Sequence, residues 1–301
     1  MKDAICGAAL AAGFCGARIL APFEPGTAAH RAFEPPVLPG GCRSGAPALL
    51  VTALAYGNRH ETPAEAAGMG IIAPFARRNY YREAVTRLQG LRARLGGKKA
   101  DYRILCNSPV PEKPLALASG LGALGRNGLI ITPGAGSLVI IAAMTLPFAL
   151  AGDGPEAGEG PFPRCAGCDR ERPPCMAACP TGAVRGDGSL DLKRCIQWYA
   201  SGKEAAVPVT VAEKWGRRLY GCTACQDACV HNRRPIQGAE TALGPLPAAL
   251  DLRDLLAQSD PELKARFKGT TLGLSWLGPG AIRRNARLAL DSEKGEVVAN
   301  R

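Results

Sequence analysis

Short apolar runs bounded by turn residues recur through the first half of the chain and predict strands. Four such runs lie at 47–56, 101–106, 127–132 and 137–146. A turn at Pro133 and Gly134 is expected to join the last two of these strands.

Residues 75–97 follow a helical period instead. One face of this predicted helix collects apolar side chains, namely Tyr81, Val85, Leu88, Leu91 and Leu95. Gly96 and Gly97 provide a stop signal. Another helix is expected over the first 20 residues, so the N-terminal half is predicted to have an α+β fold.

The second half is organised differently. A stretch rich in Gly, Pro and acidic residues predicts a linker, because it has little that could anchor a packed element. The expected units are 1–150, a linker at 151–163, a cysteine-rich domain at 164–240 and a short helical segment at 241–301.

Three helices are expected after the linker. Thr210 and Glu213 have the spacing of a capping box at the start of a short helix. Further helices are predicted from about Ser259 and about Gly280.

Composition limits the class of protein. Of 301 residues, 47% are hydrophobic, and the formal net charge is +11, which favours an anionic partner such as a nucleic acid or an acidic electron donor. The longest apolar run, 138–151, is shorter than the roughly 20 residues of a membrane span. No convincing signal-peptide cleavage site follows the N-terminus, so we expect a cytoplasmic protein that does not enter a membrane.

Cysteine spacing carries the strongest chemical signal. Eight of the 12 cysteines fall at metal-ligand spacings rather than scattered as in a disulfide framework. In two-cluster ferredoxins the last Cys of a run binds the other cluster. The predicted ligands of one 4Fe-4S cluster are therefore Cys165, Cys168, Cys175 and Cys229, and those of the second are Cys179, Cys195, Cys222 and Cys225.

Zinc is the alternative metal, since four-cysteine zinc sites also use Cys-x2-Cys pairs. The run Cys-Pro-Thr-Gly-Ala that begins at Cys179 favours iron–sulfur, because it leaves backbone amides free to face cluster sulfides. Two features depart from the usual pattern: a six-residue gap before Cys175, and Val230 where a proline is expected. The other cysteines are expected to be buried as small apolar side chains: Cys6, Cys15, Cys42 and Cys106.

A G-x-G-x-x-G string at Gly120, Gly122 and Gly125 matches the dinucleotide-binding fingerprint only in its letters. It follows a predicted helix over 111–119 rather than a strand, and Thr145 stands where an acid is needed. We therefore expect no NAD site here.

Several segments together resemble the epoxyqueuosine reductase family, cobalamin-dependent iron–sulfur enzymes that complete queuosine in tRNA. They include FARRNYYREAVTRLQGLRARL, NSPVPEKPLALASGLGALGRNGLI, CMAACPTGAV, YGCTACQDACVHN and FKGTTLGLSWLGPGAIRRNARLAL. The resemblance implies a nitroreductase-like cobalamin-binding domain, a ferredoxin-like domain with two 4Fe-4S clusters and a short helical C-terminus. It also implies a flavodoxin or ferredoxin electron donor and a tRNA substrate; we expect a monomer.

Site residues follow from the resemblance position by position. The corrin is expected to meet the backbone around Ile130 and Ile141, together with Asn107, Gln197 and Ala224. Asn107 stands where the family has the aspartate that protonates the substrate, and an amide has no proton to give at neutral pH.

Four other polar residues lie in the matching segments and could replace the missing acid: Tyr80, Tyr81, Glu112 and Lys113. The histidines are His30, His60 and His231, of which only His231 could border a cluster. The sequence leaves two rival functions open: the same architecture acting on an epoxide or organohalide outside tRNA, and a non-catalytic electron-transfer or cobalamin-handling protein.

Overall fold

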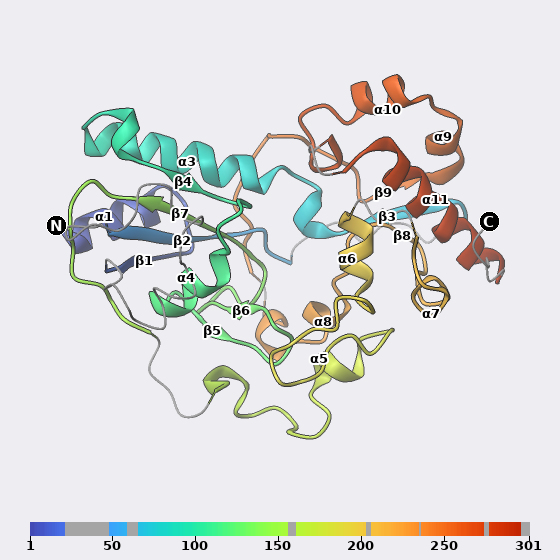
Figure 1. The fold of residues 1–301 in the computed structure, drawn as a ribbon, viewed down its shortest axis with the longest axis horizontal. Helices are drawn as coiled ribbons and strands as arrows, with labels where there is room; N and C mark the ends of the chain where they lie inside the picture. Colours follow the sequence, from blue (N-terminus) through green and yellow to red (C-terminus); the bar gives the residue numbers. More distant parts are fainter. Residues whose placement is uncertain are drawn as a thin grey trace.

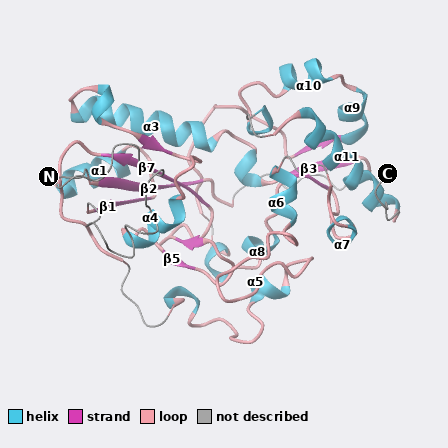
Figure 2. Ribbon diagram, viewed as in Figure 1, coloured by secondary structure: helices cyan, strands magenta, loops and turns pink. Residues whose placement is uncertain are grey.

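A computed structural model of the chain describes residues 1–21, 48–58, 66–155, 161–202, 206–234, 236–273 and 277–295. Two groups of strands form its framework, one near each end of the long axis (Figures 1 and 2). The described residues thus form a mixed α and β structure, as the sequence pattern predicted.

The N-terminal sheet has the strand order β1-β2-β7-β4, and every pairing is antiparallel. Its strands are β1 (Gly16–Leu20), β2 (Leu49–Ala55), β7 (Val139–Thr145) and β4 (Ile104–Leu105). Three of these lie in runs predicted as strands. The prediction of one helix over the first 20 residues was wrong at its end, because α1 (Lys2–Ala11) stops before Gly13 and β1 follows. Gly13 has a φ of 85°, and Arg87 donates to its carbonyl at 2.9 Å.

Helices cover both faces of this sheet (Figure 1). On one face α1 and α3 (Tyr80–Leu95) pack their buried side chains against β1, β2 and β7. On the other, α4 (Glu112–Ala118) packs against β2, β4 and β7. Asn79 caps α3 by accepting from Arg82 N at 3.1 Å, and Gly96 ends the helix as predicted.

A small hairpin, β5 (Ala123–Leu124) with β6 (Ile130–Ile131), lies outside the main sheet. The predicted turn at Pro133 and Gly134 lies between β6 and β7, where a single bridge joins Thr132 to Gly136, and β7 then enters the N-terminal sheet. The G-x-G-x-x-G string runs into β5 and a turn, and no helix opens from it.

The second sheet joins distant parts of the chain in the order β8-β3-β9. β3 (Met69–Ile72) runs parallel to β8 (Arg218–Tyr220) and antiparallel to β9 (Ala249–Asp251). Ile72 and Ala76 are buried in the same core as Trp215 and Leu252. Residues 66–79 therefore pack with the C-terminal segments, so the successive sequence segments interleave in space.

Helices around this sheet are α6 (Ile196–Ser201), α7 (Val209–Ala212), α9 (Leu252–Ala257), α10 (Asp260–Arg266) and α11 (Pro279–Lys294). The helices predicted near Ser259 and Gly280 are confirmed, and Ser259 with Glu262 forms a capping box on α10. The capping box expected at Thr210 was wrong, because α7 begins at Val209 after Pro208 and has no side-chain cap.

Short elements alternate with loops in the cysteine-rich part of the chain. They are α5 (Pro174–Ala177), α8 (Ala224–Asp227), and the 3-10 turns η3 (Pro163–Cys165) and η4 (Val230–Asn232). The remaining 3-10 turns are η1 (Pro74–Ala76), η2 (Lys99–Asp101) and η5 (Thr271–Gly273). Among the described helices, none has the length and apolar character needed to cross a membrane.

Candidate iron–sulfur and cofactor site

The first cysteine group surrounds a narrow cavity between η3, α5 and η4. All four predicted members line it: Cys165, Cys168, Cys175 and Cys229. Burial raises the pKa of Cys175, and the adjacent Cys229 and Cys165 raise it further. These thiols are therefore electrostatic neighbours although 64 residues separate the ends of the group in sequence.

The second cysteine group lines a different cavity of about 240 Å³, again with all four predicted members: Cys179, Cys195, Cys222 and Cys225. Burial, followed by the charges of Cys222, Cys195 and Cys179, raises the pKa of Cys225 to about 12. Val139 and Ile140 of β7 form part of the wall, so this cavity lies between the second cysteine group and the N-terminal sheet.

The turn after Cys179 is built to stabilise a thiolate. Burial raises the pKa of Cys179, but hydrogen bonds from the Val184 and Ala183 backbone and from Thr181 bring it below its ordinary value. Ala183 N donates to Cys179 Sγ at 3.2 Å. Backbone amides that follow the Cys-Pro-Thr-Gly run therefore face the sulfur of Cys179.

Burial raises the pKa of Cys168, Cys195 and Cys229, so each of these thiols keeps its proton more readily than a free thiol does. Metal coordination deprotonates a thiol outright. Among the described residues, no three His, Cys, Asp or Glu side chains are arranged to hold a single metal ion. The eight cysteines are thus assigned to two groups of four by the cavity that each group lines and by the effect of neighbouring thiolate charges on their pKa values.

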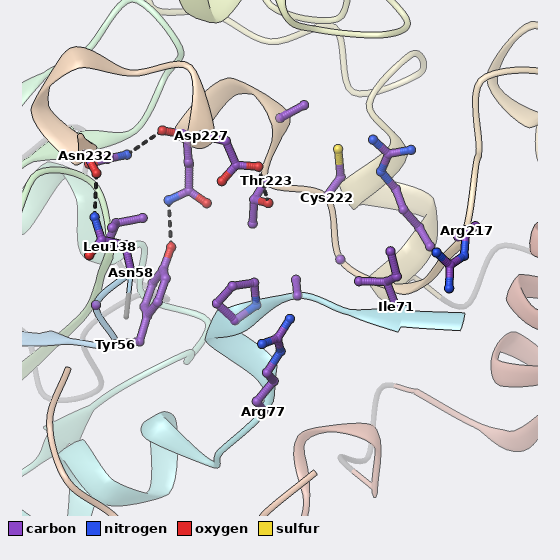
Figure 3. A pocket seen from close by; sticks show the side chains of 17 residues that line it. Tyr56, Asn58, Ile71, Arg77, Leu138, Arg217, Cys222, Thr223, Asp227 and Asn232 are labelled. Carbon is purple, nitrogen blue, oxygen red and sulfur yellow. Dashed lines mark hydrogen bonds between the residues drawn. The ribbon is translucent and has the colours of Figure 1, made fainter. Parts of the chain in front are cut away.

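A third cavity, of about 590 Å³, adjoins the second cysteine group (Figure 3). It shares Tyr56, Cys222, Ala224 and Gln226 with the cavity that the second group lines. Three arginines contribute to its lining: Arg77, Arg217 and Arg218. The arginine-lined cavity therefore adjoins a largely apolar cavity that the second cysteine group lines.

A buried polar network ties the N-terminal sheet to the second cysteine loop. Gln226 Nε2 donates to Tyr56 Oη and to Ser137 O, each at 2.7 Å. Asn232 Nδ2 donates to Ser137 Oγ at 3.0 Å and to Gln226 O at 2.8 Å. Sequence reasoning missed these residues, and only the placement of Gln226 and Asn232 among the cysteines could have pointed to them.

Two of the five residues expected near the corrin line the second-group cavity. Gln197 and Ala224 do so, and Gln197 Oε1 also accepts from Cys222 N at 2.9 Å. Ile130 and Ile141 instead pack into the core between the sheet and α4. Their side chains are absent from the lining of the described cavities, which their neighbours Leu129 and Ile140 reach.

The three catalytic candidates lie in three different environments. Tyr81 lines the second-group cavity, and burial raises the pKa of its phenol. Tyr80, one position earlier on α3, lines a separate cavity together with Arg77 and Arg78. Asn107 is exposed in the loop after β4, with a φ of 49°, and lines none of the cavities described above.

The neighbouring candidates have structural partners. Glu112 Oε1 accepts from Ser108 N at 3.1 Å, and Lys113 Nζ donates to Gly128 O at 2.7 Å. His231 Nε2 contacts Arg164 O at 2.7 Å and lies beside the first group. His30, His60 and Cys42 fall outside the described residues.

The remaining cysteines differ in exposure. Cys6 and Cys106 are half-buried and pack against the N-terminal core. The expectation of burial was wrong for Cys15, which is exposed because it follows the turn that ends α1, although its Sγ still donates to Ala53 O at 3.2 Å.

Comparisons with known proteins agree with this geometry. Residues 164–232 match the family model of a 4Fe-4S double cluster binding domain. Epoxyqueuosine reductase from Bacillus subtilis is 31% identical over 255 residues, which is 81% of this chain and 63% of the relative. The protein of the same name from Escherichia coli is 31% identical over 204 residues, covering 63% of this chain and 51% of the relative. The chain thus spans less than two thirds of these relatives.

Solved structures extend the similarity to nearly the whole chain. A Bacillus subtilis epoxyqueuosine reductase, described with its aspartate-bearing catalytic loop swung out of the active site, has a TM-score of 0.79 and 28% identity. The match covers 98% of this chain and 82% of that one. An epoxyqueuosine reductase bound to a modified tRNA stem loop gives a TM-score of 0.80 with 27% identity and the same coverage. The fold, the double-cluster domain and these relatives together show that the chain belongs to an epoxyqueuosine reductase-like family.

Proposed function

We propose that this protein is a cobalamin-dependent iron–sulfur reductase whose substrate is epoxyqueuosine in tRNA. One observation carries the proposal: two groups of four cysteines line separate cavities, and the second group faces the N-terminal sheet. The proposal includes a nitroreductase-like N-terminal domain and a ferredoxin-like cluster domain, with a cluster held by each cysteine group.

The adjoining cavities beside the second group are the proposed cobalamin site. The larger, at about 590 Å³, falls within the usual range of about 300 to 1,000 Å³ for ligand pockets. Its arginines suit the phosphate of a nucleotide-bearing cofactor, and Gln197 and Ala224 form the wall beside the cysteines. Bound there, cobalamin would supply a strongly reducing metal centre.

Tyr81 is the proposed proton donor in place of the aspartate that Asn107 replaces. Among the polar candidates from the sequence, it lies in the cavity of the second cysteine group, whereas Glu112 and Lys113 are bonded elsewhere. Burial favours the neutral phenol, which keeps the proton on Tyr81 until negative charge develops on the substrate. A phenol is a weaker acid than a carboxylic acid, so slow turnover is expected.

Electrons are proposed to enter at the first cysteine group from an acidic flavodoxin or ferredoxin. Exposed arginines flank these cysteines in sequence, namely Arg170, Arg172, Arg233 and Arg234. Two acids, Asp169 and Glu171, offset only part of this charge. Such a basic surface would steer an acidic donor by charge complementarity.

The test is reduction of epoxyqueuosine in tRNA by anaerobically purified protein loaded with cobalamin and a chemical reductant. Tyr81→Phe should abolish turnover, while Tyr80→Phe, the same change one position earlier on α3, should retain it. Turnover unaffected by Tyr81→Phe would disprove the role of Tyr81. No turnover by the wild-type protein, with clusters and cobalamin bound, would disprove the substrate.

The exposed position of Asn107 supports a second candidate, a reductase of the same architecture acting on a small epoxide or organohalide. Such a substrate need not engage this loop. The same reduced protein would then consume the small substrate and leave tRNA unchanged. An electron-transfer or cobalamin-handling protein would consume neither.

A further inference from the structure

Three buried side-chain atoms lack a hydrogen-bond partner within the part of the chain that the structure describes. They are Arg126 Nε, Asn127 Nδ2 and Thr132 Oγ1. Buried polar groups are nearly always satisfied, so each exception calls for a partner of another kind. Two of these atoms belong to adjacent residues in the turn between β5 and β6.

Asn127 occupies the wall between the two cysteine groups. It lines both the first-group and the second-group cavity and is only 2% exposed. Its Oδ1 accepts from Leu129 N at 3.2 Å. This bond fixes the orientation of the amide, because Nδ2 cannot accept from Leu129 N, and Nδ2 is therefore the unpartnered end.

Gly125 makes room for this side chain. A Cβ at Gly125 would lie 2.8 Å from Asn127 Oδ1 and 2.8 Å from Ile131 Cδ1, both closer than real Cβ contacts. One glycine of the G-x-G-x-x-G string thus has a packing role beside the cysteines. The turn is built around the Asn127 amide rather than around a dinucleotide.

We infer that Asn127 donates a hydrogen bond from Nδ2 to a sulfur of an iron–sulfur cluster at the boundary between the two cysteine groups. The inference rests on the clusters in the proposed function. Hydrogen bonds to cluster sulfurs stabilise the more negative, reduced state and so raise the reduction potential. Arg126, which lines only the first-group cavity, supplies a cation on that side. Asn127 thus contacts a cluster directly and keeps it reducible.

The test compares Asn127→Leu and Asn127→Asp with Thr132→Val. Both Asn127 variants remove the donor at nearly constant size, and Asp keeps the acceptor for Leu129 N. Thr132→Val removes another unpartnered atom, from a residue that lines neither cysteine cavity. Redox titrations of anaerobic protein, followed by electron paramagnetic resonance, should show a more negative midpoint potential for a cluster in both Asn127 variants and no shift in Thr132→Val.

Iron and sulfide are counted in every sample before titration. Unchanged potentials in the Asn127 variants at the full wild-type iron content would overturn the inference. If the variants lose a cluster, the hydrogen bond is tested in reduced wild-type protein labelled with ¹⁵N-asparagine. Magnetic coupling of a side-chain ¹⁵N to the cluster would support the inference, and the absence of coupling would overturn it. If the wild-type protein holds its clusters but leaves tRNA unchanged, only the proposed substrate is refuted. Wild-type protein without iron refutes both proposals.

Discussion

Removing the Asn232 side-chain amide should weaken the junction between the N-terminal sheet and the second cysteine loop. Its Nδ2 donates to Ser137 Oγ and Gln226 O, and its Oδ1 accepts from Ser137 N at 3.0 Å. The side chain fills space that Gly136 leaves open, since a Cβ on Gly136 would lie 2.0 Å from Asn232 Oδ1. Asn232→Ala therefore deletes three buried hydrogen bonds together.

The magnitude follows from these bonds. Each is worth about 0.5 to 1.5 kcal/mol net, and a buried donor left without a partner adds a desolvation cost. We expect Asn232→Ala to lower the free energy of unfolding by about 3 kcal/mol. At roughly 2 to 4 °C per kcal/mol for a protein of this size class, the denaturation midpoint should fall by on the order of 6 to 12 °C.

Thermal denaturation of the anaerobic holoprotein, followed by circular dichroism and by visible cluster absorbance, measures this effect. Both signals should shift together, because the lost bonds join the sheet to the cluster loop. Arg233→Ala is the control, since Arg233 is the next residue and is exposed. A midpoint for Asn232→Ala within about 1 °C of that control would refute the reasoning.

Three further outcomes are expected. Anaerobically purified protein should hold about eight irons and eight sulfides per chain, and Cys195→Ser should reduce the iron count. Stoichiometric zinc, or about four irons per wild-type chain, would contradict the presence of two clusters. Asn107→Asp should raise turnover of epoxyqueuosine tRNA by up to about 10²-fold, because a carboxylic acid donates a proton more readily than the Tyr81 phenol. The left-handed backbone at this position suits Asp as well as Asn. Unchanged turnover in a variant that binds cobalamin would show that the loop does not reach the substrate. Gly125→Ala should displace Asn127 and lower the thermal midpoint by several degrees, whereas an unchanged midpoint would show that the turn adapts without strain.

Much of the local structure follows from the sequence because it depends on neighbours along the chain. Asn79 and Gly96 delimit α3 by capping and by a positive φ. The cysteine spacing likewise predicted two groups of four, and each of these groups lines a cavity of its own. The missing strand after α1 and the misplaced cap of α7 show where local signals were too weak.

Long-range pairing decided the rest, because apolar periodicity does not encode which distant surfaces meet. β3 joins β8 and β9, which follow it by well over 100 residues, so the chain segments interleave where a linear reading separated them. Tyr80 and Tyr81 are adjacent in sequence, yet the helical rotation of about 100° per residue directs them into different cavities. Asn127 gains its position between the two cysteine groups in the same way: the sequence supplies the amide and the glycine that accommodates it, and the tertiary fold brings both cavities to that amide.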